Sequence, residues 1–447
     1  MTDGHRTGSP RPPRVLLIAE LANPDWSSAP LVAWSLFEAL SRRADVHLVT
    51  HVRNRENIAR TGLPPERFTI LDNRSVERPA LALANALRGT SDPGGRGQTI
   101  VTAFATLAYY RFEQLLWKRL GDRIRRGEFD VVHRLTPLNA TVPSILAPRC
   151  RRAGVPFVIG PLQGGLPWPR QFTRERRREG EWLGHVRNLH RLMPGYASTR
   201  RDAAAIIVGS RNALSQIADR YRAKCVYIPE NAVAPERFGG GASGPVTLPL
   251  RVAFVGRMVP CKMAELLLEA ALPLIRRGQV ELDYIGDGPE LPQVRARAAA
   301  EGVDGAVSFA GWLRHPALQE RLARAHVFGF PSIHEFGGAV VLEAMATGLV
   351  PVVVDYGGPP ELVSPATGFA VPMGLREELI AGLRAVLERL LAAPETIRPM
   401  GERARARVLR SFTWDAKAAQ VLDVYRWVTG RGDKPDFGMP FPDEERG

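Results

Sequence analysis

The sequence predicts an α/β fold of two doubly wound, Rossmann-like domains that face a central cleft. The first observation is that short apolar runs alternate with segments of helical pattern, which is typical of βαβ units. The second is that this pattern stops at a segment rich in glycine, proline and serine and then starts again. The third is the length of 447 residues, which suffices for two or three domains of about 100–200 residues each.

The first domain is predicted to span residues 14–238, after a polar, proline-rich tail at 1–13 that we expect to be disordered. Residues 51–100 have a less regular pattern, with a glycine-rich break at 94–97. Buried strands are predicted from compact apolar runs at 14–19, 46–50, 130–133, 156–160, 203–208 and 226–228. Helices are predicted from amphipathic patterns at 30–40, 107–125, 143–153 and 212–221.

The second domain is predicted to span residues 250–411, after a linker at 239–249. A last helix is expected at 412–428 and a flexible tail at 430–447. The predicted strands are 250–255, 280–285, 307–309, 327–330 and 350–354. The predicted helices are 265–276, 291–301, 316–325, 373–391 and 399–410.

The composition is that of a globular protein with a sizeable core, at 45% hydrophobic and 24% charged residues. The formal net charge of +14 indicates an anionic partner, which leaves a nucleotide, a nucleic acid or an acidic membrane surface open. Three scattered cysteines argue against a disulfide framework or a zinc site and predict a reducing cytoplasm. We expect neither a signal peptide nor a transmembrane helix, because the required apolar runs are missing.

Residues 330–361 combine acids and glycines around a predicted helix start. Glu335 and Glu343 lie eight positions apart, and Gly337 and Gly338 between them open an apolar helical run. A second glycine pair, at 357–358, follows the next strand. Free N–H groups and the helix dipole at such a start favour a phosphate group. The stretch therefore predicts a site for a polyhydroxylated, anionic ligand.

The second domain resembles the retaining glycosyltransferases of family 4, which have the GT-B fold. The final helix also resembles the family's last helix, which crosses back to the first domain. The motifs that carry the resemblance occur in the family's order: FVGR at 254–257 with a lysine at 262, IGDGPE at 285–290, SFAGW at 308–312, E-x7-E at 335–343, YGGPPELV at 356–363 and GFAVP at 368–372.

The resemblance implies a nucleotide-sugar donor and catalytic roles for Arg257, Lys262, Glu335 and His133. The arginine and the lysine would face the charge that builds on the leaving diphosphate. Glu335 would hold a sugar hydroxyl, and Glu343 would accept hydrogen bonds from the ribose hydroxyls. The residues implied to bind the donor are Gly256, Phe336, Gly337, Gly338, Glu343, Ser27 and Ser28.

Three positions depart from the family's pattern. The first loop carries Ser27 and Ser28 where members often have paired glycines, so these serines either cap the following helix, the favoured interpretation, or donate to the ligand. His133 matches the first histidine of an H-x-H pattern whose second position is leucine here, and it either reaches a ligand or is structural. Met263 replaces the glycine after Lys262, so the backbone is expected to differ there.

No D-x-D pair occurs in the sequence, so neither a metal nor another cofactor is expected. The most basic stretch, 170–201, holds nine arginines and three glutamates. It is either a solvated charged surface or a docking site for an anionic membrane, with Trp168, Phe172 and Trp182 at the headgroups. The second alternative would place the protein at the inner face of the plasma membrane.

The main predicted function is retaining sugar transfer to a glycan, a lipid-linked or a small-molecule acceptor, in cell-surface polysaccharide or glycoconjugate synthesis. One alternative is a GT-B-fold sugar-nucleotide epimerase, against which the basic pair and the E-x7-E motif weigh. Another is a basic nucleic-acid-binding protein without catalysis. The sequence lacks a recognisable nucleic-acid motif, so we expect no nucleic-acid partner.

Overall fold

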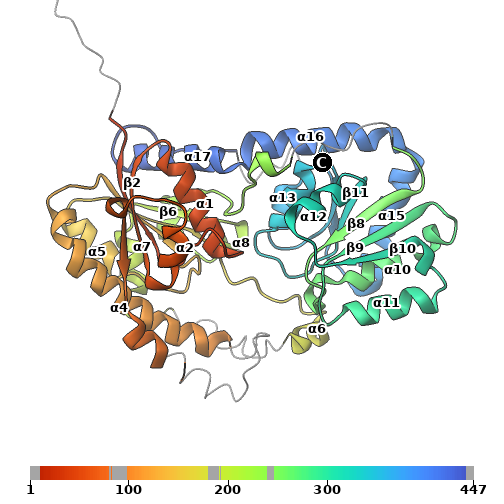
Figure 1. Cartoon of the computed structure of the whole chain (residues 1–447), viewed down its shortest axis with the longest axis horizontal. Helices are drawn as coiled ribbons and strands as arrows, with labels where there is room; N and C mark the ends of the chain where they lie inside the picture. The colour runs from red at the N-terminus through yellow and green to blue at the C-terminus, as the bar shows by residue number, and fades with distance from the viewer. Residues whose placement is uncertain are drawn as a thin grey trace, which may run out of the picture.

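The protein consists of two α/β domains side by side, each built on one parallel sheet (Figure 1). The structure is a computed structural model that describes residues 11–79, 82, 98–179, 191, 193–238 and 246–438, with only the backbone at 98–105 and 315. The predicted glycine-rich break at 94–97, Trp182 and most of the predicted linker and terminal tails lie outside the described residues. None of the described helices combines the length and the apolar character needed to cross a membrane.

The sheet of the first domain has seven strands in the order β3-β2-β1-β4-β5-β6-β7. Val15 of β1 pairs in parallel with Val46 of β2 and with Val131 of β4, and all three side chains are buried. The order reverses at β1, and ligands bind outside the carboxyl ends of strands at such switch points. The strands are β1 (Arg14–Ala19), β2 (Asp45–His51), β3 (Phe68–Leu71), β4 (Val131–Thr136), β5 (Phe157–Leu162), β6 (Ala205–Val208) and β7 (Cys225–Tyr227).

Helices cover both faces of this sheet, as the burial of alternate faces of its strands requires. The helices are α1 (Ala29–Ser41), α2 (Arg55–Ala59), α4 (Gln98–Arg125), α5 (Leu146–Arg152), α6 (Thr173–Arg178), α7 (Tyr196–Asp202), α8 (Arg211–Ser215) and α9 (Asp219–Arg222). Short 3₁₀ turns occur at η1 (Val52–Asn54), η2 (Pro65–Arg67) and η5 (Pro235–Arg237).

The sheet of the second domain has six strands in the order β10-β9-β8-β11-β12-β13. The strands are β8 (Leu250–Val255), β9 (Val280–Ile285), β10 (Val307–Gly311), β11 (Val327–Phe330), β12 (Val350–Asp355) and β13 (Phe369–Pro372). The helices are α10 (Ala264–Ile275), α11 (Leu291–Ala300), α12 (His315–Leu322), α13 (Ala339–Ala346), α14 (Pro359–Leu362), α15 (Arg376–Ala392), α16 (Ile397–Ser411) and α17 (Trp414–Val428). The 3₁₀ turns are η6 (Pro260–Lys262), η7 (Asp304–Ala306) and η8 (Pro394–Thr396).

The last two helices run along one side of the whole molecule. Figure 1 shows α16 over the second domain and α17 over the first. The buried side chains Val421, Val424 and Tyr425 of α17 pack in the same core as α1 and the middle strands of the first sheet. The chain thus crosses between the domains a second time, and the packing of α17 on the first domain helps to hold the two domains together.

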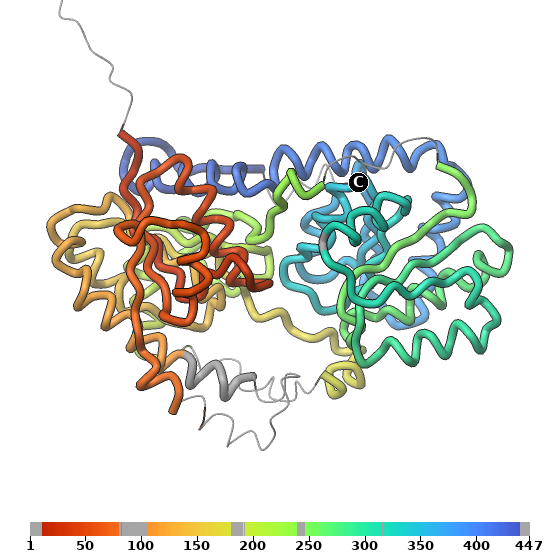
Figure 2. Tube along the Cα trace, in the orientation of Figure 1, coloured from red at the N-terminus to blue at the C-terminus, as the bar shows by residue number. Residues whose placement is uncertain are grey.

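A segment of the first domain docks into the second. Residues 163–179, drawn in yellow in Figure 2, cross the gap between the domains and end in α6. Phe172 is only 3% exposed and belongs to the core of the second domain, and Trp168 stacks on His334 at 4.5 Å between ring centroids. The predicted role of Phe172 at a membrane is therefore wrong, because the second domain covers this side chain, whereas Trp168 is partly buried against the second domain.

Replacing Phe172 by alanine is expected to destabilise the protein by about 3 kcal/mol or more, because a buried aromatic ring leaves a cavity. The measurement is the free energy of unfolding in urea. The matched control is Leu375→Ala, since Leu375 is 56% exposed and its truncation removes little buried surface. An equal, small change in both variants would contradict the docked position of Phe172.

Candidate functional site

A cleft of about 900 Å³ lies between the two domains, at the carboxyl ends of strands from both sheets. The first domain contributes the loop after β1 and one face of α1, and the second contributes the ends of β8, β9 and β10 and one face of α13. The predicted residues that line it are Ser27, Ser28, Gly256, Arg257 and Glu343. The cleft has the volume and the position expected for a small-molecule site in such folds.

Glu343 is a partly buried carboxylate on α13 that faces this cleft. Among the described residues, no side chain forms a hydrogen bond with its carboxylate, and α13 is otherwise apolar around it. Burial raises the pKa of Glu343 to about 7, and the positive charge of Arg237 opposes that shift. A carboxylate held in this way is available to accept hydrogen bonds from a ligand.

The affinity for a nucleotide sugar is expected to rise by up to about tenfold between about pH 6 and about pH 8. The Glu343 carboxyl is mostly protonated below its pKa of about 7 and becomes a double acceptor above it. The measurement is the Kd of a nucleotide sugar, whose diphosphate diester does not titrate in this range. Glu343→Gln should lack this rise in affinity, and the same rise in both proteins would contradict the assignment.

Arg257 follows directly after β8 and Gly256, and its exposed side chain lines the cleft. Among the described residues it has no salt-bridge partner, so its guanidinium is available to an anionic ligand. Figure 1 places this end of β8 toward the first domain. The geometry therefore allows Arg257 to meet negative charge that lies between the domains.

Lys262 and Glu335 form an ion pair with each other and are not among the residues that line the cleft. The Lys262 ammonium lies 4.9 Å from the centroid of the Phe330 ring. Burial lowers the pKa of Lys262 to about 8, so the side chain remains mostly charged near pH 7. The Glu335 carboxylate also accepts from the Gly338 N–H, at 3.4 Å. In this structure the Glu335 carboxylate therefore binds the Lys262 ammonium and the Gly338 N–H, which were both predicted to meet a phosphate.

Glycines of both pairs in residues 330–361 lie where a larger side chain would collide with its neighbours. A side chain on Gly337 would collide with the Asn231 amide and the Glu230 carboxyl group of the preceding domain, and one on Gly358 would collide with the Phe336 carbonyl oxygen. Glu230 is itself buried, and burial raises its pKa to about 7, while Gln163 donates to it at 2.5 Å. The sequence did not single out Glu230 or Gln163, because neither belongs to a motif.

Ser28 does not cap α1, contrary to the favoured interpretation of the sequence. It occupies the N-cap position, but its side chain makes no capping hydrogen bond, and its backbone has φ 61° and ψ −139°. Such a conformation is essentially restricted to glycine. Ser27 and Ser28 are both exposed and line the cleft, so their hydroxyl groups are available to a ligand.

Met263 adopts a backbone conformation that glycine favours. Its φ of 53° and ψ of 37° lie in the left-handed region. The side chain is 6% exposed and packs in the core of the second domain. That packing explains how a non-glycine residue is held there. Among the described residues, Ser28 and Met263 are the non-glycine residues with positive φ.

His133 is a core residue, and the ligand role predicted for it is not supported by its position. The side chain is fully buried, accepts at Nδ1 from the Tyr425 hydroxyl at 2.6 Å and donates from Nε2 to the Gly160 carbonyl at 2.7 Å. Burial lowers its pKa to about 4, so the ring is neutral near pH 7. The ring joins β4 to α17 and β5, and it does not line the cleft.

Several cleft residues were not predicted from the sequence. Trp312, which is 73% exposed, follows β10 on the second-domain wall, and Trp26, which is 41% exposed, lies on the first-domain wall. Trp312 belongs to the SFAGW motif, which could have signalled it, whereas Trp26 and Arg237 carry no sequence signal. Exposed tryptophans in a cleft offer flat apolar surfaces on which rings can stack.

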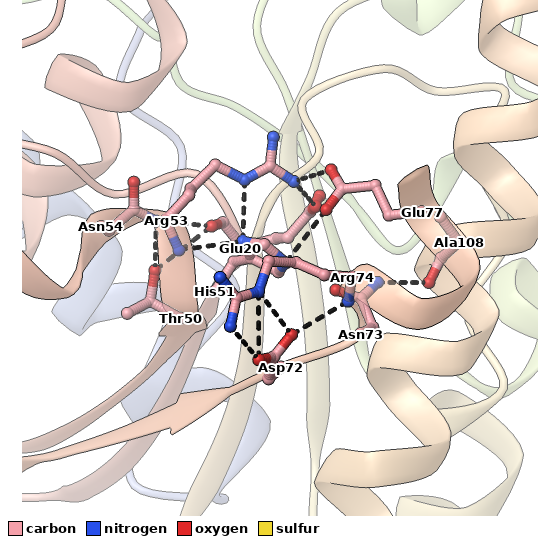
Figure 3. Close-up of polar contacts among 10 residues, drawn as sticks. All are labelled: Glu20, Thr50, His51, Arg53, Asn54, Asp72, Asn73, Arg74, Glu77 and Ala108. Atoms are coloured by element: carbon pink, nitrogen blue, oxygen red, sulfur yellow. Dashed lines mark hydrogen bonds and ion pairs between the residues drawn. The ribbon is translucent and has the colours of Figure 1, made fainter. Parts of the chain in front are cut away.

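A polar network lies at the carboxyl edge of the first sheet, next to the cleft loop (Figure 3). At its centre the Arg53 side chain donates to His51 Nδ1 at 2.9 Å, to Glu20 Oε1 at 2.8 Å and to Glu77. His51 Nε2 lies 3.1 Å from Glu77 Oε2. The network comes from the ends of β1, β2 and β3, and the sequence did not indicate it.

Comparison with known proteins identifies the second domain. The family model described as Glycosyl transferases group 1 matches residues 249–389. The C-terminal domain is similar to the group 1 glycosyl transferases. This match, together with the relatives described below, confirms the predicted resemblance to family 4 glycosyltransferases.

Curated relatives of this glycosyltransferase domain match about two fifths to half of the chain. An alpha-maltose-1-phosphate synthase of Mycolicibacterium smegmatis is 33% identical over 187 residues, which are 40% of this chain and 48% of the relative. An alpha-D-kanosaminyltransferase of Streptomyces kanamyceticus is 30% identical over 179 residues, which are 40% of this chain and 45% of the relative. The chain therefore spans about half the length of these curated relatives.

Solved structures resemble the whole glycosyltransferase fold. A sucrose-phosphate synthase from Thermosynechococcus elongatus superposes with a TM-score of 0.59 at 18% identity and covers 94% of this chain and 100% of its own. HepE from Anabaena in complex with UDP gives a TM-score of 0.58 at 15% identity and covers 92% of this chain and 98% of its own. These likenesses confirm the predicted GT-B fold of two Rossmann-like domains.

Proposed function

We propose that the protein transfers a sugar from a nucleotide-diphosphate sugar to a glycan, lipid-linked or small-molecule acceptor, with retention of the anomeric configuration. The observation that carries the proposal is the position of Glu343 and Arg257 together in the cleft, in a domain of the group 1 glycosyl transferases. A carboxylate suits ribose hydroxyls, and a guanidinium suits a diphosphate. Solved neighbours of the same fold hold UDP and UDP-glucose.

The proposed mechanism places the donor on the second domain and the acceptor on the first. The nucleoside would lie against Glu343 and the diphosphate between Arg257 and Lys262, so that fixed positive charge meets the leaving group. Lys262 would exchange its contact with Glu335 for the phosphate, which frees Glu335 for a sugar hydroxyl. The leaving phosphate itself would take the proton of the acceptor hydroxyl.

The proposed reaction uses no metal ion. The chain would neutralise the diphosphate with its own cations, Arg257 and Lys262, and with the exposed hydroxyl groups of Ser27 and Ser28. Turnover in the presence of a chelator should therefore equal turnover in its absence. A loss of activity on chelation that added Mg²⁺ or Mn²⁺ restores would contradict this part of the proposal.

The first test is a thermal-shift screen against UDP-, GDP-, ADP- and TDP-sugars. A ligand that binds only the folded state raises the apparent stability by about 2.7 kcal/mol at one hundred times its Kd. We expect one nucleobase series to raise the melting temperature and the others to leave it unchanged. No shift with any of the four series would contradict the proposal. With the donor known, NMR of the product's anomeric proton tests retention.

A role in cell-surface polysaccharide or glycoconjugate synthesis at an anionic membrane is a separate part of the proposal. Within the described part of the basic stretch, Arg170, Arg174 and Arg177 are exposed, whereas Arg178 pairs with Glu290. Exposed arginines of this kind support contact with acidic headgroups. Pelleting with vesicles that contain anionic lipid at low salt tests it, and absence of binding would refute it.

A further inference from the structure

Two loops at the carboxyl edge of the first sheet are cross-linked to each other. The β1 loop, residues 20–28, lines the cleft through its second half, and the β2 loop, residues 51–60, lies behind it. Each crossing contact joins a residue of one loop to a residue of the other. The contacts fall into three tiers, from the buried base of the loops to the rim of the cleft.

The base of this cross-link is charged and the middle is a buried amide pair. Arg53 of the β2 loop donates to the Glu20 side chain at 2.8 Å. Asn54, which is fully buried, donates to the Glu20 carbonyl at 2.8 Å and accepts from the buried Asn23 amide at 3.3 Å. Figure 3 shows Arg53 and Asn54 close to Glu20. The Asn54 amide also donates to the Thr50 hydroxyl at 2.8 Å. Buried polar groups whose hydrogen bonds are satisfied in this way fix one geometry.

The rim of the cross-link is an exposed carboxylate contact. Asp25 Oδ2 accepts from the Asn57 amide at 2.6 Å and from the Arg60 guanidinium at 2.6 Å. Asp25 also donates its backbone N–H to the Asn23 side chain at 3.0 Å. Asp25 therefore links the buried Asn23–Asn54 pair to the rim of the cleft, and it lies three residues before Ser28.

Ser28 is the residue that this arrangement holds under strain. Its φ of 61° and ψ of −139° are adopted freely by glycine and rarely by serine. Its hydroxyl makes no capping bond, and it is exposed in the cleft. Strained backbone persists only where surrounding contacts over-determine it. The three tiers of contacts supply such a constraint on the loop that contains Ser28.

We propose that Asn23, Asp25 and Asn54 are positioning residues that hold Ser28 in its glycine-like conformation before a ligand arrives. The loop is then ready to present the Ser28 hydroxyl to the negatively charged part of the ligand in the cleft. The nature of that ligand rests on the proposed function, whereas the strain at Ser28 does not. Serine in place of glycine adds a donor, and the cross-linked loops keep that donor in position.

A double-mutant cycle between Asn54→Asp and Ser28→Gly tests the proposal. Asn54→Asp replaces the donor to the Glu20 carbonyl by an acceptor of the same shape. In the wild-type background it should raise the Kd of the nucleotide sugar by about tenfold, which corresponds to about 1.4 kcal/mol, because Ser28 relaxes and must be strained again on binding. In the Ser28→Gly background it should raise the Kd by less than about twofold, because glycine has no strain to restore. An equal factor in both backgrounds would overturn the proposal.

Urea unfolding of the same four proteins provides a test that needs no ligand. Asn54→Asp should cost less stability in the wild-type background than in the Ser28→Gly background, because only in the former does it release strain. Equal losses of stability in the two backgrounds would overturn the proposal about Ser28, whether or not a nucleotide binds the wild type. Absence of nucleotide binding would refute only the proposed function. Where Asn54→Asp does not fold, Asp25→Ala replaces it in the cycle, since the Asp25 side chain is 52% exposed.

Discussion

Lys262→Ala is expected to lower kcat by about 10²- to 10³-fold, which is the usual effect of removing one donor aimed at developing charge. Lys262 is a partly buried lysine at the carboxyl edge of the second sheet, and its partner in this structure is a carboxylate. We infer that the leaving diphosphate takes the place of that carboxylate during the reaction. The measurement is steady-state turnover of the nucleotide sugar identified in the thermal-shift screen.

Two companion variants separate lost chemistry from lost stability. Lys262→Ala leaves the Glu335 carboxylate without its cation, so the double variant with Glu335→Gln removes this unpaired charge and should restore the melting temperature without restoring turnover. Lys434→Ala is the matched control, because Lys434 is exposed and does not line the cleft. Wild-type turnover in Lys262→Ala would remove Lys262 from the catalytic site.

Glu343→Ala is expected to weaken nucleotide binding by about 100-fold, because hydrogen bonds to a charged group contribute about 1.5–3 kcal/mol each. The carboxylate is partly buried, faces the cleft and has no hydrogen-bond partner among the described residues. It is therefore free to accept from both ribose hydroxyls. The measurement is the Kd of the nucleoside diphosphate by calorimetry.

A 2′-deoxynucleotide makes this second prediction specific to the ribose. The wild type should bind the 2′-deoxy ligand more weakly than the ribonucleotide, whereas Glu343→Ala should no longer distinguish the two. Glu377→Ala serves as the matched control, because Glu377 is exposed on α15. A full preference for the ribonucleotide in Glu343→Ala would place the ribose elsewhere.

The fold could be predicted because several of its strands are compact apolar runs, such as 14–19 and 350–354, which the structure forms in β1 and β12. The edge strand β3 was missed because four residues at a sheet edge carry little apolar signal. The predicted helix at 212–221 is two short helices, α8 and α9, with a break between residues 215 and 219. Short elements of this kind depend on tertiary contacts, which a local pattern does not contain.

Motifs located part of the cleft lining, whereas the motif residues Lys262 and Glu335 pair with each other and do not line it. Glu343 and Arg257 belong to motifs, and both line the cleft. His133 was placed at the end of a predicted strand, but β4 continues to Thr136, so the ring points into the core. Ser28 adopts positive φ although it is not glycine, because neighbouring loops hold it. Sequence patterns carry no information about such constraints.

Calorimetric titration of the full chain with UDP, GDP, ADP and TDP tests whether a nucleotide binds between the two domains. We expect one of the four to bind with a stoichiometry of one per chain, and we expect Glu343→Ala and Arg257→Ala each to weaken that binding at least tenfold. Unchanged affinity in both variants would show that the nucleotide does not lie in the cleft between the two domains. Absence of binding by all four nucleotides would contradict a nucleotide-sugar donor altogether.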